Sequence, residues 1–152
     1  MLDSQPVDVA QEFKTMQIEL VRVDNAFHFE AIGTSGVAQH IDAATDIGGH
    51  NAGARPMEML LMGLAGCSAI DVILILQKQK QVIEDFRLKV DGFREKDATP
   101  SPFKKIHITY LLKGQLNADK VKRAIDLSMD KYCSATAQLR PSAEITYSFE
   151  IQ

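Results

Sequence analysis

The chain has 152 residues, a formal net charge of −3 at pH 7 and 45% hydrophobic residues. This length suits one domain with a sizeable core, so we predict a single domain over residues 1–152. The composition excludes a disordered chain, and the charge does not favour nucleic acid as a partner. Residues 1–13 have no basic or long apolar leader segment, so we predict no signal peptide and expect a cytoplasmic location.

Three strands are predicted in the first third of the chain. Hydrophobic and polar residues alternate over residues 16–23 (MQIELVRV) and again over 27–32 (FHFEAI). The Asp24-Asn25 pair between them is typical of a hairpin turn. A third strand is expected around residues 36–42 (GVAQHID), and the glycine-rich residues 44–56 are expected to form a loop.

Residues 55–77 (RPMEMLLMGLAGCSAIDVILILQ) form the most apolar run of the chain. Its length matches a bilayer core. Glu58 and Asp71 lie inside it, however, and a carboxylate near the centre of a membrane span costs roughly 2.5 kcal/mol or more. We therefore predict no membrane span but the central helix of a globular core, running from Pro56 to about Lys80. Pro56 suits the first turn of this helix, and Glu58 complements the positive end of its dipole.

The rest of the chain predicts two strands, a helix and a last strand. The strands cover residues 86–90 and 104–113, joined by a polar connection, and the last strand covers 143–151. Alternation places one side of each strand in the core: Phe86, Leu88 and Val90; Ile106, Ile108, Tyr110 and Leu112; Ile145, Tyr147, Phe149 and Ile151. Asn117 is a good N-cap for a second helix, whose stripe is expected to run through Val121, Ala124, Ile125, Ser128, Met129 and Tyr132 to Cys133. The order is βββ-α-ββ-α-β, an α+β fold in which helices cover one face of antiparallel sheet.

The two cysteines, Cys67 and Cys133, lie in the apolar stripes of separate core helices. They could be small core hydrophobes or a reactive thiol with its resolving partner, and sequence spacing does not fix the distance between them. Asp71 follows Cys67 by one helical turn, and a carboxylate there disfavours a thiolate. A reactive Cys67 therefore needs a nearby cation, and the candidates are Arg22, Arg55 and Arg140.

Metal and cofactor motifs are absent from the sequence. His28, His40, His50 and His107 have no ligand-like spacing, and a zinc site made by both cysteines with one of them is only a weak alternative. The chain has no GxSxG, Walker phosphate loop or HExxH pattern. We predict no metal and no cofactor.

The element order, together with residues 56–72 (PMEMLLMGLAGCSAIDV) and 130–136 (DKYCSAT), resembles the OsmC/Ohr superfamily over essentially the whole chain, and most of all its YhfA-like branch. The resemblance implies an intertwined homodimer and a thiol peroxidase acting on small organic hydroperoxides. Cys67 would form a sulfenic acid, Cys133 would resolve it as a disulfide, and a dithiol reductant would reduce that disulfide.

The resemblance also implies an activating shell around the thiol. An arginine from the first hairpin would be Arg22, and a helper glutamate near the proline would be Glu58. Independently of the resemblance, the start of the long helix offers an adaptable apolar lining for a substrate or a ligand: Met57, Met59, Leu61 and Met62, with Arg55 as a further substrate-binding candidate. A non-enzymatic member that binds an apolar ligand at the dimer interface is the alternative.

This chain departs from the superfamily pattern at two positions. Met57 stands where the active hydroperoxide reductases have glutamate, and Ser134 stands where they have proline. Glu58 lies nine residues before Cys67, which puts the two on opposite sides of an unbroken helix.

Cys133 is expected near the C-terminal end of its helix, where the negative pole disfavours a thiolate, and this favours Cys67 as the attacking sulfur.

Overall fold

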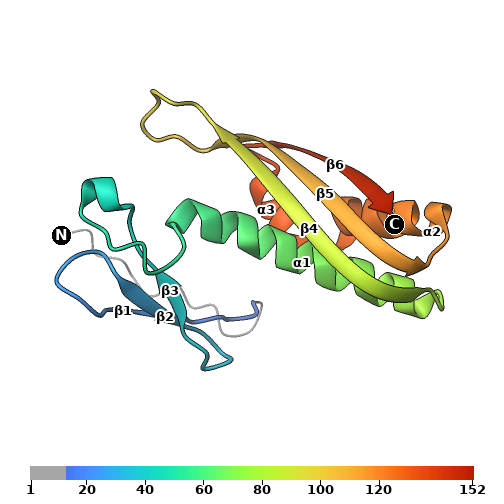
Figure 1. Cartoon of the computed structure of the whole chain (residues 1–152), viewed down its shortest axis with the longest axis horizontal. Coiled ribbons are helices and arrows are strands. Elements are labelled where there is room, and N and C mark those ends of the chain that lie inside the picture. The colour runs from blue at the N-terminus through green and yellow to red at the C-terminus, as the bar shows by residue number, and fades with distance from the viewer. Residues whose placement is uncertain (1–12) are drawn as a thin grey trace. The chain divides into compact units, whose positions relative to one another are not determined.

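The computed structural model describes residues 13–152, whose contacts divide the chain into a unit ending at Pro56 and a unit beginning at Met57 (Figure 1). The predicted absence of a signal peptide concerns residues that lie largely outside this range.

The N-terminal unit is a small antiparallel sheet of three strands, β1 (Glu19–Arg22), β2 (Phe29–Ile32) and β3 (Gln39–Ile41), in the order β1-β2-β3. The predicted hairpin is confirmed, although its strands are shorter than the alternation suggested. Asp24 holds its turn, because Oδ1 accepts hydrogen bonds from the backbone N–H groups of Ala26 at 2.8 Å and His28 at 3.2 Å.

The glycine-rich segment after β3 contains a short 3₁₀ helix, η1 (Thr45–Ile47). Asp42 organises this segment from a buried position. Its carboxylate accepts hydrogen bonds from the N–H groups of Ala43, His50 and Ala52 at 2.7, 3.0 and 3.1 Å. Burial opposes ionisation of Asp42, but these three donors outweigh it and lower the pKa of the carboxyl.

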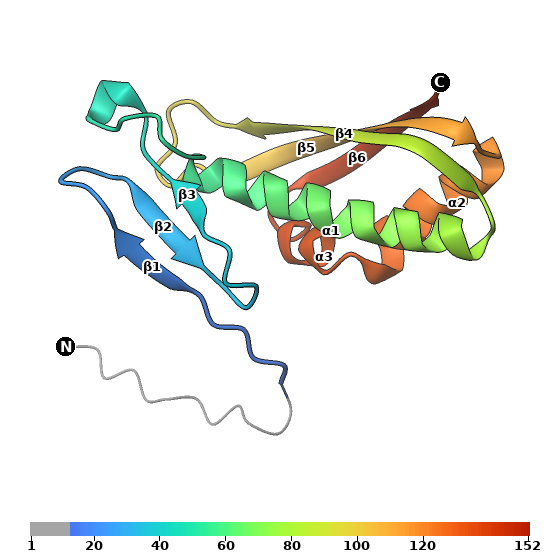
Figure 2. The ribbon, with the colours of Figure 1, turned by 60° about the horizontal axis from the view of Figure 1, so that its bottom comes forward.

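The C-terminal unit is one layer of helices on a three-stranded sheet. Its elements are α1 (Pro56–Lys78), β4 (Val82–Arg94), β5 (Phe103–Gln115), α2 (Ala118–Leu127), the π-helical turn η2 (Ser128–Tyr132), α3 (Ser134–Leu139) and β6 (Glu144–Ile151). Figure 2 shows all of the helices on the same face of the sheet. The α+β architecture and the helical layer are therefore as predicted.

The sheet has the order β4-β5-β6, and one of its two pairings differs from the prediction. β4 and β5 are antiparallel, but β5 and β6 run parallel, so the sheet is mixed and not purely antiparallel. The reason is that α2 and α3 carry the chain back between β5 and β6, and a helical crossover returns the next strand in the same direction.

The predicted inward faces of all three strands are confirmed. Ile106, Ile108, Tyr110 and Leu112 of β5 are buried, and the alternating apolar residues of β4 and β6 pack against the same core. Tyr110 lies at its centre and makes edge-on ring contacts with Phe86 and Tyr147, at centroid distances of 6.4 and 6.2 Å. Edge-to-face geometry at these distances is favourable.

Helix α1 covers this core with one face only. Leu64, Ser68, Val72 and Leu76, spaced four residues apart, are buried. On other sides Leu60, Met62, Ile70 and Leu74 remain 46% to 63% exposed. The length and composition of α1 would let it cross a membrane, a test that the core helices of soluble proteins also pass.

The second predicted helix is interrupted. Its N-cap is confirmed, since the Asn117 side chain accepts a hydrogen bond from the Lys120 N–H at 3.1 Å. After Leu127, however, the chain makes the π-helical turn η2, and Cys133 becomes the N-cap of α3. The expectation that Tyr132 lies in the buried stripe was wrong, because Tyr132 is 50% exposed. A π turn adds a residue per turn and rotates the stripe away from its α-helical course.

We predict that Ile108→Ala lowers the free energy of unfolding by about 2–5 kcal/mol, because it leaves a cavity in the core under α1. The neighbouring Thr109→Ala, whose side chain points to the opposite face of β5, should cost less than about 1 kcal/mol. Urea denaturation of both variants measures the difference. Equal costs would contradict the placement of this core.

Candidate functional site

The structure brings the two cysteines together beside a carboxylate. The sulfur atoms of Cys67 and Cys133 and a carboxylate oxygen of Asp71 all lie within 4.8 Å of one another. Both cysteines are free thiols, Cys133 being buried and Cys67 partly exposed. The expectation that Asp71 shares a helical face with Cys67 is confirmed. We call these three residues the dithiol–carboxylate cluster.

The separation of the sulfurs allows a disulfide. A disulfide has an S–S length of about 2.05 Å, so the two sulfurs need to approach by less than about 3 Å. Side-chain rotation supplies much of such a movement. The arrangement therefore supports reversible oxidation, which two isolated core cysteines would not.

Cys133 lies where two helical segments meet. It is the C-cap of η2, which continues α2, so its expected place at the end of the second helix is confirmed. It is also the N-cap of α3, and the Thr136 N–H donates to its sulfur at 3.3 Å. Burial raises the pKa of the Cys133 thiol, the hydrogen bond from the Thr136 N–H opposes this rise, and the nearby Cys67 adds to it. Burial thus disfavours a thiolate at Cys133, in addition to the negative pole of the preceding helix.

A row of buried hydroxyl groups leads from the core to the cluster. Tyr110 Oη lies 2.5 Å from Ser68 Oγ, Ser68 Oγ lies 3.1 Å from Ser128 Oγ, and Ser128 Oγ donates to Asp71 Oδ2 at 3.3 Å. Because Ser128 has a single proton and gives it to Asp71, Ser68 must donate to Ser128 and Tyr110 to Ser68. Every proton in the row therefore points towards the carboxylate.

Sequence reasoning missed the role of Ser68, Ser128 and Tyr110. It placed Ser128 and Tyr110 on core faces but gave them no partners. The available signal was a hydroxyl within each of three apolar stripes, since buried polar groups are nearly always hydrogen-bonded. Burial raises the pKa of Tyr110 to about 12, although the Ser68 hydroxyl lowers it, so its hydroxyl stays a donor at neutral pH.

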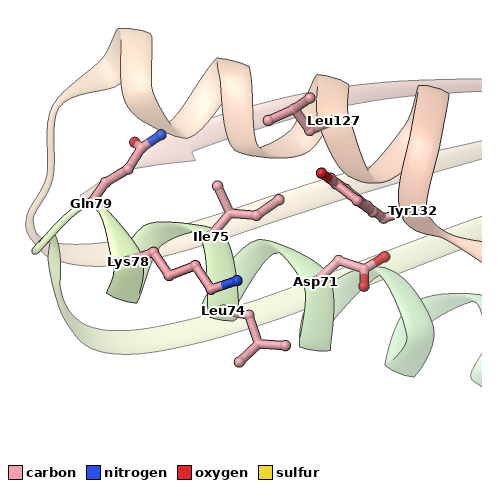
Figure 3. Close-up of a pocket in the computed structure, with 7 residues that line it drawn as sticks. All are labelled: Asp71, Leu74, Ile75, Lys78, Gln79, Leu127 and Tyr132. Carbon is pink, nitrogen blue, oxygen red and sulfur yellow. The ribbon is translucent and has the colours of Figure 1, made fainter.

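Asp71 also lines a groove of about 350 Å³ between α1 and the α2–η2 segment (Figure 3). Leu74 and Ile75 of α1 and Leu127 of α2 form its apolar middle. Lys78, Gln79 and Tyr132 contribute polar groups. In Figure 3, Asp71 and Tyr132 lie at one end of the groove and Gln79 at the other. The groove thus places apolar surface next to a member of the cluster.

The predicted substrate-lining residues Met57, Leu61 and Met62 lie around other hollows. Leu61 and Met62, with Glu58, line a hollow of about 260 Å³ against β4, and Met57 lines another beside residues 98–102. Cys67 lines neither of them. Glu58 occupies the first turn of α1, where a carboxylate complements the helix dipole as expected.

The candidate arginines bind backbone carbonyls of their own units. Arg22 donates to the carbonyls of Ala26 at 2.8 Å and Asn25 at 2.6 Å, and so clamps the β1–β2 turn. Arg55 donates to Gly53 O at 3.1 Å and to the Asn51 side chain at 2.7 Å. In the C-terminal unit, Arg140 donates to the carbonyl of Met129 at 3.0 Å.

The histidines do not join the cluster. In the N-terminal unit, His28 Nε2 lies 2.8 Å from His40 Nδ1, and His50 Nδ1 lies 2.9 Å from Asp24 Oδ2. His107 contacts hydroxyl groups on β6. Within residues 13–152, the donor group that could hold a metal ion therefore consists of the two cysteines and Asp71, without the histidine that the zinc alternative required.

The C-terminal unit is an α+β domain in which a long apolar helix carries one of two neighbouring thiols, so the protein is of the dithiol α+β class. Comparisons with known proteins identify its family. The family model described as OsmC-like protein matches residues 49–148, so the chain belongs to the OsmC-like protein family. It is 43% identical over 97 residues to Protein YhfA of Escherichia coli (strain K12), covering 63% of this chain and 72% of that protein. The predicted family resemblance is confirmed.

Solved structures share the fold. A hypothetical protein from Aquifex aeolicus VF5 superposes with a TM-score of 0.77 and 27% identity, over 92% of this chain and 99% of that one. An organic hydroperoxide resistance protein OsmC from Legionella pneumophila superposes with a TM-score of 0.67, over 90% of this chain and 97% of that one. Its identity is 16%, so it shows the common fold alone.

We predict that the free energy of unfolding falls as the pH rises from about 10 to about 12. The folded state keeps Tyr110 protonated with a pKa of about 12, whereas an unfolded tyrosine titrates near pH 10. Stabilisation from this group is therefore complete below about pH 10 and is lost as the pH rises towards about 12.

Urea denaturation across this range measures the decline, which should be shallower for Tyr110→Phe than for the wild type. Part of the decline should remain, since burial and the Asp126 hydrogen bond also raise the pKa of Tyr147. Tyr132→Phe, at the surface, is the matched control. Identical slopes for wild type and Tyr110→Phe would contradict the buried hydroxyl row.

Proposed function

We propose that this protein is a thiol peroxidase that reduces small organic hydroperoxides with Cys67 and Cys133. The observation that carries the proposal is the approach of both sulfurs and the Asp71 carboxylate to within 4.8 Å. Membership of the OsmC-like family supports a peroxide-related activity, as does the fold shared with proteins named for organic hydroperoxide resistance.

The reaction begins with attack of the Cys67 thiolate on the terminal peroxide oxygen. The O–O bond breaks, an alcohol leaves after taking up a proton, and Cys67 becomes a sulfenic acid. The Cys133 thiolate then attacks the Cys67 sulfur, water leaves, and a disulfide forms. A dithiol reductant takes the disulfide back to two thiols. Cys67 is assigned the attack because it is partly exposed, whereas Cys133 is buried.

Asp71 serves this cycle as a proton acceptor. A permanent negative charge beside a thiol disfavours a standing thiolate. A carboxylate near both sulfurs can instead take the proton when each sulfur attacks, once a side-chain movement or one bridging water brings it within hydrogen-bond reach. The groove beside Asp71 holds the apolar part of the hydroperoxide.

A second candidate is a non-enzymatic protein that binds an apolar ligand. The groove of about 350 Å³, with Leu74, Ile75 and Leu127 in its middle, favours this function too. A ligand-binding protein has no need for paired sulfurs, however. Catalytic consumption of hydroperoxide with a dithiol reductant separates the two functions.

The variants Cys67→Ser and Cys133→Ser should fail differently. Cys67→Ser should lose consumption of cumene hydroperoxide in the presence of a dithiol reductant, because the attacking sulfur is gone. With a single equivalent of hydroperoxide and no reductant, Cys133→Ser should react once and stop at a sulfenic acid, seen as one added oxygen or a dimedone adduct by mass spectrometry.

The double variant Cys67→Ser/Cys133→Ser gives the baseline for uncatalysed loss of hydroperoxide. If Cys133→Ser were unreactive while Cys67→Ser still formed a sulfenic acid, the two roles would be reversed. If both single variants kept the wild-type rate, the peroxidase proposal would fail.

We further propose that the protein is a cytoplasmic, intertwined homodimer. Helix α1 exposes Leu60, Met62, Ile70 and Leu74, and the strands of the N-terminal unit also expose apolar side chains. An exposed apolar surface of this kind is typical of an interaction site. An added Cβ on Gly63 or Gly66 would meet no atom within 4 Å, so these positions permit close approach of a second helix. The reduced thiols that the cycle needs suit a reducing compartment.

Ile70→Glu should convert the dimer to a monomer. Ile70 is 63% exposed on α1, so a charge there is tolerated by the single chain but not by an apolar interface. Light scattering at micromolar concentration measures the mass, with Lys105→Glu on the outer face of the sheet as the matched control. A wild-type protein that stayed at 16.8 kDa would overturn the dimer.

A further inference from the structure

We infer that the reduced protein binds Zn²⁺ through the sulfurs of Cys67 and Cys133 and a carboxylate oxygen of Asp71, with a fourth coordination position left for water or a ligand. This site goes beyond the proposed peroxidase and does not rest on it, since metal binding needs only the reduced sulfurs and the carboxylate.

The spacing of the donor atoms suits a small tetrahedral ion. Zinc–sulfur bonds of about 2.3 Å and zinc–oxygen bonds of about 2.0–2.2 Å place tetrahedral ligands about 3.4–3.8 Å apart. The three donor atoms already lie within 4.8 Å of one another, so a contraction of about 1 Å completes the geometry.

The donor types select the metal. Thiolate ligands favour zinc over magnesium and calcium, which prefer all-oxygen sites. Two thiolates with one carboxylate give three protein ligands, the number found in zinc sites that keep an open position. Asp71 also lines the groove between α1 and the α2–η2 segment, so a ligand lying in the groove reaches the neighbourhood of the fourth position.

The surroundings of the cluster orient two of the three ligands. The Ser128 hydroxyl donates to Asp71 Oδ2 at 3.3 Å, which leaves the other oxygen available, and the hydroxyl row fixes Ser128 in turn. The Thr136 N–H donates to the Cys133 sulfur at 3.3 Å. Hydrogen bonds of this kind to ligand atoms are typical of protein metal sites.

The charge of the cluster also favours a cation. No Lys or Arg side chain within residues 57–152 forms an ion pair with Asp71, while other carboxylates of this unit pair with Arg87, Lys122 and Arg140. When Zn²⁺ binds, each thiol releases its proton to solvent as a sulfur–zinc bond forms. The metal then balances the charge of both thiolates.

Oxidation and metal binding exclude each other at this site. A disulfide takes both sulfurs out of the thiolate state, so an oxidant that joins Cys67 to Cys133 releases the zinc. Conversely, bound zinc would slow the peroxidase reaction, because the Cys67 thiolate would be coordinated to the metal. The same three residues thus couple the metal content of the protein to its redox state.

The test uses the reduced, chelator-stripped full chain, titrated with Zn²⁺ against a chromophoric chelator and separately with Co²⁺. We expect one metal ion per chain, release of about two protons, and the thiolate-to-cobalt absorption of a tetrahedral site. Cys67→Ser, Cys133→Ser and Asp71→Asn should each lose this binding, and Ser128→Ala should weaken it by about 10-fold or more. Asp130→Asn, whose side chain is 75% exposed on η2, is the matched control.

Oxidation by dipyridyl disulfide, which needs no peroxidase activity, should abolish binding, and reduction should restore it. Zinc binding that persisted in the double variant Cys67→Ser/Cys133→Ser would assign the metal to histidines and overturn the proposal. No binding to the reduced wild type, or a cobalt spectrum without thiolate absorption, would overturn it as well. The cobalt spectrum of the wild type shows whether thiolates bind the metal, even if a variant fails to fold.

Discussion

The hydrogen-bonded row from Tyr110 to Asp71 is the constraint on which the site depends. It begins on the central strand β5, crosses α1 at Ser68 and reaches η2 at Ser128. These hydrogen bonds fix the positions of β5, α1 and η2 relative to one another, although the three elements are far apart in the sequence. Cys67 directly precedes Ser68 in the chain, and the Cys133 N–H donates to the Ser128 carbonyl at 2.8 Å, so the packing that forms the row also brings the sulfurs together.

The row places polar hydroxyl groups inside an apolar layer, and each of these groups has a hydrogen-bond partner. A buried hydroxyl that lacks a partner costs about 1–3 kcal/mol, whereas each hydroxyl here has one. The row ends on a carboxylate that also borders a groove, so its last member is the one exposed to ligands. Such a network makes one rigid position for Asp71 beside two sulfurs that remain able to move.

Much of the fold could be predicted from periodicity. Alternation identified the inward faces of β4, β5 and β6, and Pro56 with Glu58 marked the start of α1. The direction of β6 was mistaken because alternation is the same in parallel and antiparallel strands. The π turn at Ser128–Tyr132 was also missed, since one extra residue in a turn leaves no hydrophobic signature.

The site was predictable only in part, because a sequence pattern shows residue types but not the distances between residues on different elements. The cysteines stood out by type and by family pattern, but the sequence could not give their separation, which depends on how α1 and α3 pack. Asp71 was interpreted as a residue that makes Cys67 inert, because a charge was considered without its partners. In the structure Ser128 donates a hydrogen bond to this carboxylate beside both sulfurs, and there we propose that it accepts a proton or binds a metal.

The most direct test of this account is the intact mass of the reduced wild-type protein after one equivalent of an organic hydroperoxide. The account predicts a loss of two hydrogens within a single chain, and a peptide map in which the segments around Cys67 and Cys133 are joined. An unchanged mass, a stable gain of one oxygen, or a disulfide between two chains would contradict the claim that these two sulfurs form one redox site.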